Sequence, residues 1–237
     1  DKNIGIAKCL TEKQYFTKKC SFSNLYSNEK NLVIKNGWLP NLDNCSVNNC
    51  LLTKNSILLI NGLNGSGKST YMKMQLFNIF LTQSLGVACA DLFVCSPFSS
   101  ILGHLSLTDD TGNLSLFQKE VSQCKELIEN LEYYKGSNNK TFIVLDELFS
   151  STNPIEGLQS AIHVIERINS FNNCLCTITT HYSNIKNEIN KKELSNQITY
   201  RHFWFDKNKN FDFKIKSGFC KNNIGFAIET VKNSLDI

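Results

Sequence analysis

Residues 61–70 read Asn61-Gly62-Leu63-Asn64-Gly65-Ser66-Gly67-Lys68-Ser69-Thr70, and this stretch decides the fold. It fits G-x-x-x-x-G-K-[ST], the pattern of a phosphate-binding P-loop. The apolar run Ile57–Ile60 precedes it as a strand, and a segment with helical spacing follows it. Glycines let the backbone turn so that successive N–H groups point at phosphate oxygens, and the helix adds the positive end of its dipole. A Gly-rich turn that matches by chance is the alternative, and the flanking strand and helix argue against it.

The motif predicts a nucleoside triphosphate with Mg²⁺ as the ligand. Lys68 is expected to reach the β- and γ-phosphates, and the Ser69 hydroxyl is expected to hold Mg²⁺. The predicted nucleotide-binding residues are Gly62, Asn64, Gly65, Ser66, Gly67, Lys68, Ser69 and Thr70.

Strands alternate with helices on either side of the P-loop, which predicts an α/β fold. A continuous apolar run such as Ile57–Ile60 is typical of a parallel strand that is covered on both faces. Two runs that flank a polar turn, Phe203–Phe205 and Phe211–Ile215, predict an antiparallel hairpin. The other predicted strands are Leu32–Ile34, Val87–Ala90, Ile101–Leu107, Thr141–Leu145 and Cys174–Thr179, and the predicted helices are 70–85, 115–134, 158–168 and 225–231. We expect a three-layer P-loop NTPase with a mixed sheet, closed by a C-terminal hairpin and helix.

Length and composition are those of an ordinary globular protein with one good core. The chain has 237 residues, of which 41% are hydrophobic and 19% charged. Its apolar runs all fall short of the roughly 18 residues that span a bilayer, and the N-terminus lacks the layout of a signal peptide. A net charge of +4 is too weak to indicate nucleic-acid binding by itself. We therefore expect an intracellular protein without a membrane partner.

The ten cysteines include no C-x-x-C pair. This spacing argues against a zinc site and against a disulfide framework. Buried, reduced thiols in a reducing compartment are the expected state.

Asp146 and Glu147 directly follow the apolar run Thr141–Leu145. A P-loop needs an acidic strand end, because Mg²⁺ between the phosphates must also be held from the protein side. Asp146 is the expected second Mg²⁺ ligand, the Walker B residue, and Glu147 is the expected general base for the attacking water. A solvated turn is the alternative for such a pair, and the P-loop upstream favours the functional interpretation.

His181 follows the strand Cys174–Thr179, where its side chain could reach the γ-phosphate. An isolated histidine is more often a surface or core residue. Three strand ends in the order P-loop, Asp-Glu and His resemble the layout of ATP-binding-cassette ATPases. Such a resemblance implies two nucleotide sites between two facing domains.

Three segments make this resemblance specific to the MutS family of DNA mismatch-repair ATPases. Gly62–Tyr71 resembles that family's G-P-N-M-x-G-K-S-T-Y, including Asn64, which a generic P-loop does not need. Val144–Leu158 resembles D-E-[IL]-G-R-G-T-S-T-x-D-G-L with no gap, and Thr179–Tyr182 resembles A-T-H-Y. Weaker matches at Ile101–Asp110, Ser115–Glu120, Asp1–Leu10 and Gly218–Glu229 extend the resemblance to essentially the whole chain. We accordingly expect 1–35 to be the end of a preceding helical or lever region, and 36–237 to be the ATPase domain.

The resemblance implies ATP as the nucleotide, hydrolysed with Mg²⁺ by Lys68, Glu147 and His181, the last of which senses the γ-phosphate. It implies that Ser115 reaches the nucleotide of a second MutS-like subunit and that Asn153 lines the same interface. Homodimers and heterodimers remain open. Dimer closure would drive a DNA clamp, with DNA held by domains outside this chain.

The chain departs from the family pattern at three places. Leu39-Pro40 stands where the family has His-Pro, and Phe149-Ser150-Ser151 replaces Gly-Arg-Gly. Cys45–Val47 occupies the place before Asn48 where family members put a ring against adenine. The phosphate and metal residues are intact, so the chain resembles a divergent member.

Two other functions stay open. A nucleotide-binding dimerisation module that barely hydrolyses ATP is motivated by the altered loop after Glu147. Another cassette-type ATPase, acting in recombination or chromosome maintenance, is the third possibility. A transporter-type or chromosome-maintenance cassette should carry an L-S-G-G-Q-like signature, which Asn113–Phe117 does not match.

Overall fold

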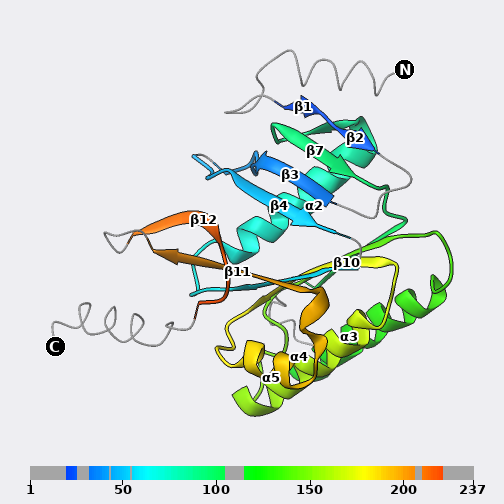
Figure 1. The fold of residues 1–237 in the computed structure, drawn as a ribbon, viewed down its shortest axis with the longest axis vertical. Helices are drawn as coiled ribbons and strands as arrows, with labels where there is room; N and C mark the ends of the chain where they lie inside the picture. The colour runs from blue at the N-terminus through cyan, green and yellow to red at the C-terminus, as the bar shows by residue number, and fades with distance from the viewer. Residues whose placement is uncertain are drawn as a thin grey trace.

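The computed structural model describes residues 20–25, 32–42, 44–53, 55–104, 115–205 and 210–220. A six-stranded mixed sheet in the order β12-β11-β5-β10-β9-β8 forms its centre (Figure 1). Five of these strands run parallel, and β12 pairs antiparallel with β11. The strands are β5 (Ile57–Asn61), β8 (Ser100–His104), β9 (Thr141–Leu145), β10 (Cys174–Thr180), β11 (Ile198–Phe205) and β12 (Phe211–Ser217). The predicted α/β class, the mixed sheet and the C-terminal hairpin are confirmed.

Helices cover both faces of this sheet. On one face lie α3 (Leu116–Tyr133), α4 (Pro154–Asn169) and the short α5 (Ile185–Lys191), followed by a 3₁₀ turn at Leu194–Gln197. Helix α2 (Lys68–Leu85) lies on the other face (Figure 1). Strand β5 shows why the run had to be apolar throughout, because its side chains alternate between two cores. Ile57 and Leu59 pack with α3 to α5, whereas Leu58 and Ile60 pack with α2.

A second sheet of four strands lies beyond α2, and the sequence analysis did not predict it. Its order is β2-β7-β3-β4, formed by β2 (Asn24–Leu25), β7 (Leu92–Cys95), β3 (Leu32–Gly37) and β4 (Asn48–Leu52). A small ladder joins β1 (Ser21–Phe22) to β6 (Val87–Ala88). The predicted strand 87–90 is therefore wrong beyond Ala88, and β7 was missed. Short strands with mixed pairing carry too little periodicity to be found in one sequence.

The buried faces of two helices differ from the predicted ones. The helical spacing of apolar residues in the sequence predicts that Phe80 lies on the apolar face of α2 and Val121 on that of α3, but both are largely exposed. Glu120 is buried in place of Val121, and α2 buries Gln75 and Asn78. Each of these buried polar side chains forms hydrogen bonds; Asn78, for example, donates to Met74 O and accepts from Cys89 N. Hydrogen bonding removes most of the cost of burial, and helical spacing alone does not reveal it.

Strand β9 has the predicted bounds, and the other predicted elements within the described residues are found with shifted ends. Helix α4 begins four residues before the predicted start because Asn153 caps it and Pro154 takes its first turn. None of the nine cysteines in the described ranges forms a disulfide, and no described helix is long and apolar enough to cross a membrane. The helix expected at 225–231, the turn at 206–209, residues 105–107 and the segment resembling a lever at 1–10 lie outside the described residues.

Candidate functional site

Three parallel strands end at one edge of the main sheet, and the three predicted motifs follow them. Strand β5 leads into the P-loop, β9 into Asp146-Glu147 and β10 into His181. In open α/β sheets the carboxyl ends of the strands are where ligands bind. A cavity of about 580 Å³ lies here and is lined by Asn64, Gly65, Gly67, Lys68, Ser69, Thr70, Asp146 and Glu147, together with Gly37, Leu42, Asn44, Cys45, Ser46, Asn48, Tyr71, Met74 and Phe213. The structure thus brings most of the predicted residues to one cavity.

The P-loop reaches α2 through a glycine in a left-handed conformation. Gly67 has φ of 105° and is the N-cap of the helix. A side chain there would be strained, and its Cβ would lie 3.4 Å from the Phe213 ring. Four backbone N–H groups at the start of any helix lack intrahelical partners, so this end suits an anion. Gly62 and Ser66 were also predicted to bind the nucleotide, but both are buried within the P-loop and do not line the cavity.

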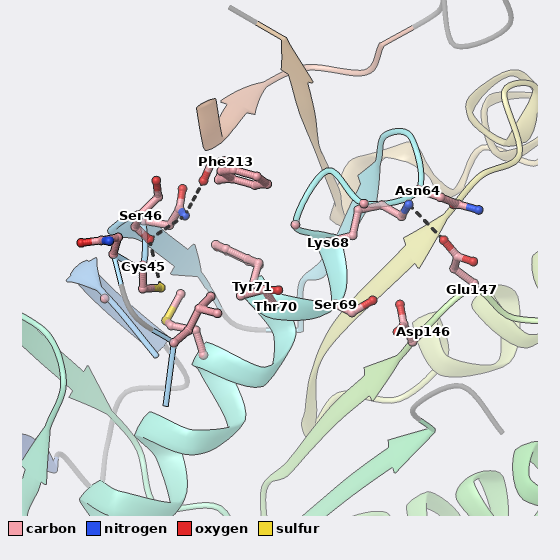
Figure 2. Close-up of a pocket in the computed structure, with 17 residues that line it drawn as sticks. Cys45, Ser46, Asn64, Lys68, Ser69, Thr70, Tyr71, Asp146, Glu147 and Phe213 are labelled. Carbon is pink, nitrogen blue, oxygen red and sulfur yellow. Dashed lines mark hydrogen bonds and ion pairs between the residues drawn. The ribbon is translucent and has the colours of Figure 1, made fainter. Parts of the chain in front are cut away.

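Lys68 is almost completely buried at the base of the loop. Its Nζ donates to Gly62 O at 2.9 Å and to Leu63 O at 3.1 Å, and it lies 3.0 Å from Glu147 Oε1. A buried ammonium is stable only when it is paired and hydrogen-bonded. The carboxylate of Glu147 supplies that partner here (Figure 2).

Asp146 and Glu147 are held by a threonine on the neighbouring strand. Thr179 Oγ1 donates to Asp146 Oδ1 at 2.5 Å and accepts from Glu147 N at 3.0 Å. The second bond holds Glu147 in a left-handed conformation, φ 51°, which is unusual for a residue other than glycine. Thr179 lies in the segment Thr179–Tyr182 that resembles the A-T-H-Y motif, but the motif does not indicate that this hydroxyl bonds to the Asp146 carboxylate and the Glu147 backbone.

Ser69 and Asp146 face each other across the cavity in Figure 2. One hydroxyl and one carboxylate suit Mg²⁺, which keeps several waters and binds proteins through one or two carboxylates plus substrate phosphates. Within the described ranges, no cluster of three or more His, Cys, Asp or Glu side chains could hold a metal without such a substrate. The Ser69 hydroxyl and the Asp146 carboxylate are donors that would fit a magnesium ion also bound by the phosphates of a nucleotide.

The loop after Glu147 is fixed from α3 and from Tyr182. The buried carboxylate of Glu120 accepts from Phe149 N at 3.0 Å and from Ser151 Oγ at 2.6 Å. Tyr182 donates to Phe149 O at 2.8 Å, and a Cβ on Gly157 would collide with that tyrosine hydroxyl. Phe149 itself is left-handed, with φ of 57°. These contacts show how the chain keeps an ordered turn here without the two glycines.

His181 lies outside the residues that line the cavity, and its ring packs on Tyr182 with centroids 4.3 Å apart. Although the residue is exposed at the surface, desolvation by the surrounding protein lowers its pKa. The Glu147 carboxylate opposes this shift, and the Lys68 ammonium adds to it. His181 therefore shares an electrostatic environment with the two residues that form the ion pair.

Ser115 and Asn153 are exposed, do not line the cavity and each cap a helix. Ser115 Oγ accepts from Gln118 N at 3.2 Å and Gln118 Oε1 accepts from Ser115 N, which completes a capping box on α3. Asn153 Oδ1 accepts from Ile155 N at 2.9 Å at the start of α4. Both are therefore placed by ordinary caps on the protein surface.

Comparison with known proteins gives a consistent result. A family model described as MutS domain V matches residues 58–234. The DNA mismatch repair protein MutS of Fusobacterium nucleatum is 31% identical over 179 residues, which are 74% of this chain and 19% of that protein. MutS protein homolog 4 of Mus musculus is 31% identical over 70% of this chain and 18% of its own length. DNA mismatch repair protein MSH3 of Candida albicans is 25% identical over 96% of this chain. The chain spans about a fifth of the length of the relatives it matches.

Proposed function

Because this chain belongs to the MutS family and matches its domain V over 58–234, we propose that it binds ATP and hydrolyses it. One observation carries the proposal. The P-loop from β5 and the Asp146-Glu147 pair from β9 line the same cavity, although about eighty residues separate them in the sequence. A phosphate cradle and an acidic strand end at one site are what P-loop NTPases require, and we propose that the domain is of the cassette type.

Each residue has a proposed role that its position supports. The P-loop backbone and Lys68 bind the phosphates, and Lys68 exchanges the Glu147 carboxylate for phosphate oxygens. Ser69 and Asp146 hold Mg²⁺, which neutralises charge on the β- and γ-phosphates when it is bound. Release from Lys68 leaves Glu147 able to orient a water and take its proton. His181 senses the γ-phosphate from the end of β10.

Relatives with mismatch-repair names support a role in DNA repair for the protein that contains this domain. We propose that the domain pairs with a second MutS-like subunit around two composite nucleotide sites and that closure drives a DNA clamp. DNA would be held by other domains. Residues 36–237 are the proposed ATPase domain and 1–35 the end of a preceding helical or lever region, although β3 (Leu32–Gly37) crosses that boundary. Cysteines outside disulfides, as found for those in the described residues, would suit a reducing intracellular compartment.

A single-turnover assay with Glu147→Gln tests the hydrolysis. Loss of the general base should lower the rate by at least about 100-fold, whereas ATP affinity should be retained or increased. Glu156→Gln, an exposed glutamate on α4, is the matched control and should hydrolyse like the wild type.

The same assay decides between the enzyme and a dimerisation module that barely hydrolyses ATP. Two features motivate this second function. The proposed general base Glu147 is held in an ion pair with Lys68, and Phe149-Ser150-Ser151 replaces the family's Gly-Arg-Gly in the loop that follows it. Equal and negligible rates for the wild type and Glu147→Gln, with ATP still bound, would establish the module and reject the enzyme. Because the chain belongs to the MutS family, we no longer propose the third function, that of a cassette ATPase from another family.

Mixed subunits test the proposed dimer. In a dimer of one Ser115→Ala chain and one Asp146→Ala chain, one site would keep both groups if Ser115 acts on the partner's nucleotide. Half of the wild-type hydrolysis per dimer is expected. No hydrolysis in the mixed dimer would mean that Ser115 acts within its own subunit.

A further inference from the structure

Two buried thiols meet beside the small ladder that joins β1 to β6. Cys20 Sγ lies 3.4 Å from Cys89 Sγ, which is hydrogen-bond distance for sulfur, although 69 residues separate the two cysteines in the sequence. The two residues are 5% and 0% exposed. Neither lines the cavity of the proposed ATP site. The contact therefore belongs to a part of the molecule that the proposed function does not use.

The register of the ladder sets these two cysteines directly opposite each other. Strands β1 and β6 are antiparallel and pair Ser21 with Ala88, so the next pair in the same register is Cys20 with Cys89. Opposing residues that exchange no backbone hydrogen bond have Cα atoms about 4.5 Å apart and side chains in close contact. A disulfide needs Cα atoms about 4.4–6.8 Å apart. An opposing pair of this kind can therefore be bridged without a shift in register.

The backbone of Cys89 is held by groups outside the ladder. Its N–H donates to Asn78 Oδ1 of α2 at 2.6 Å, and its carbonyl oxygen accepts from Trp38 N, which follows β3, at 2.9 Å. These partners suit a residue that exchanges no backbone hydrogen bond with the one opposite it. Cys20, Cys89 and Trp38 also form one small apolar cluster. The second thiol is thus fixed in place and faces the first.

The hydrogen bond between the thiols gives them different reactivity. A bond donated by the Cys89 thiol lowers the pKa of Cys20, and desolvation opposes this shift. The same hydrogen bond, together with burial, raises the pKa of Cys89. Because the thiolate is the form that attacks an oxidant, Cys20 is the reactive sulfur and Cys89 is the partner that resolves it. Strand β1 has only two residues, and so short a ladder opens at low cost to admit a small oxidant.

We propose that Cys20 and Cys89 are a site of reversible oxidative modification, at which a peroxide converts two thiols into a disulfide. The Cys20 thiolate attacks the O–O bond of hydrogen peroxide. A sulfenic acid forms, and the hydroxide that leaves takes up the proton that Cys20 had lost. The Cys89 sulfur then attacks the Cys20 sulfur, so that the S–S bond forms and the S–O bond breaks. The second hydroxide takes the Cys89 proton. Two thiols lose two electrons, and one peroxide becomes two waters.

The disulfide would close a loop of 69 residues that contains the P-loop and the whole of α2. A crosslink over a loop of this length restricts the unfolded chain and stabilises the folded one. It would also fasten β1 to the segment that follows α2. In a reducing compartment the two thiols would be restored by exchange with a small thiol such as glutathione.

Peptide mapping of the full 237-residue chain after exposure to hydrogen peroxide tests the proposal. A digest prepared without reductant should contain peptides joined through Cys20 and Cys89, and dithiothreitol should separate them. The oxidised wild type should unfold at a temperature higher than that of the reduced wild type by roughly 5 °C or more. Cys20→Ser should show no such gain.

Cys220→Ser is the matched control, because Cys220 is a partly buried cysteine at the other end of the described chain. It should form the joined peptide as the wild type does. The wild type oxidised in urea gives the yield expected for an unfolded chain.

Three results would overturn the proposal. They are no joined peptide from the folded wild type, Cys20 joined mainly to another cysteine, and a yield of the Cys20–Cys89 peptide no higher than in urea. All three are measured on the wild type, so they do not depend on whether Cys20→Ser folds. None of them bears on the proposed ATP site, whose residues lie elsewhere.

Discussion

The two ends of the cavity are built in opposite ways. At the phosphate end, Lys68 and Asp146 are 4% and 5% exposed and are held by short hydrogen bonds from two strands and the P-loop. The other end is lined by Leu42, Cys45, Ser46 and Phe213, and we call it the base end because the nucleoside of a bound nucleotide would lie there (Figure 2). Leu42 and Phe213 are 45% and 46% exposed and come from segments far apart in the chain. Buried charged groups are costly to leave without a partner, whereas exposed apolar groups can be exchanged at little cost. We therefore expect the phosphate end to tolerate almost no change and the base end to tolerate much.

The largest effect should come from Lys68→Ala. This change removes the buried cation that would bind the phosphates and leaves Glu147 without its partner, so ATP affinity should fall by at least about 100-fold. Isothermal titration measures the affinity, and circular dichroism checks that the domain stays folded. Lys73→Ala, an exposed lysine on the same helix, is the control. Retained micromolar affinity in Lys68→Ala would contradict its phosphate role.

Thr179→Val should have the next largest effect. Valine keeps the shape but loses the hydrogen bonds to Asp146 and to the Glu147 backbone, and bonds to charged groups contribute about 1.5–3 kcal/mol. Hydrolysis should fall roughly tenfold, with a higher Mg²⁺ requirement, as measured in single-turnover assays over a magnesium series.

Thr177→Val is the control for that experiment. Thr177 is two residues earlier on β10, and its buried Oγ1 finds no partner within the described part of the protein. Loss of an unsatisfied hydroxyl should leave hydrolysis unchanged and stability equal or higher. Equal damage from both changes would show that packing of β10, not the bonds to the carboxylates, matters.

A smaller effect is expected from Leu42→Ala at the base end. The side chain is half exposed, so ATP affinity should change by less than about threefold. Binding of a fluorescent ATP analogue, displaced by ATP, measures it. A loss of about tenfold or more would mean that the base end holds the nucleotide closely and that the contrast between the two ends is weaker.

The smallest effect concerns His181. Its pKa in the folded chain is below the value of 6.5 that the unfolded chain has, so the unfolded state binds the proton more readily. Its contribution to stability is present above pH 6.5 and is lost as the pH falls through the lowered folded-state pKa. The unfolding temperatures of the wild type and of His181→Gln, measured between pH 5 and 7.5, should therefore approach each other slightly as the pH falls. A raised pKa in an NMR titration of His181 would contradict this.

Local sequence was enough to predict the phosphate end. The P-loop glycines, Lys68 and the Asp146-Glu147 pair lie directly after strands, and a parallel sheet brings its carboxyl ends to one edge whatever the detail of packing. The same logic predicted the strands at 57–60, 141–145 and 174–179. Helical spacing did not predict that α3 buries Glu120 and exposes Val121. Glu120 is buried because its carboxylate accepts a hydrogen bond from the backbone N–H of Phe149, on a loop 29 residues away.

The sequence by itself therefore determined the class of fold and the positions of the proposed phosphate and metal residues at the strand ends, since each of these depends on neighbours within a few positions. Only the tertiary structure decided the second sheet, the threonine that bonds to the Asp146 carboxylate and the Glu147 backbone, and the hairpin ring beside the P-loop. These features depend on pairs such as Asn48 and Phe213, which pack together only after the chain has closed a loop of about 165 residues. Short-range periodicity carries no trace of such contacts, because it records which face of an element is apolar and not which element will cover it.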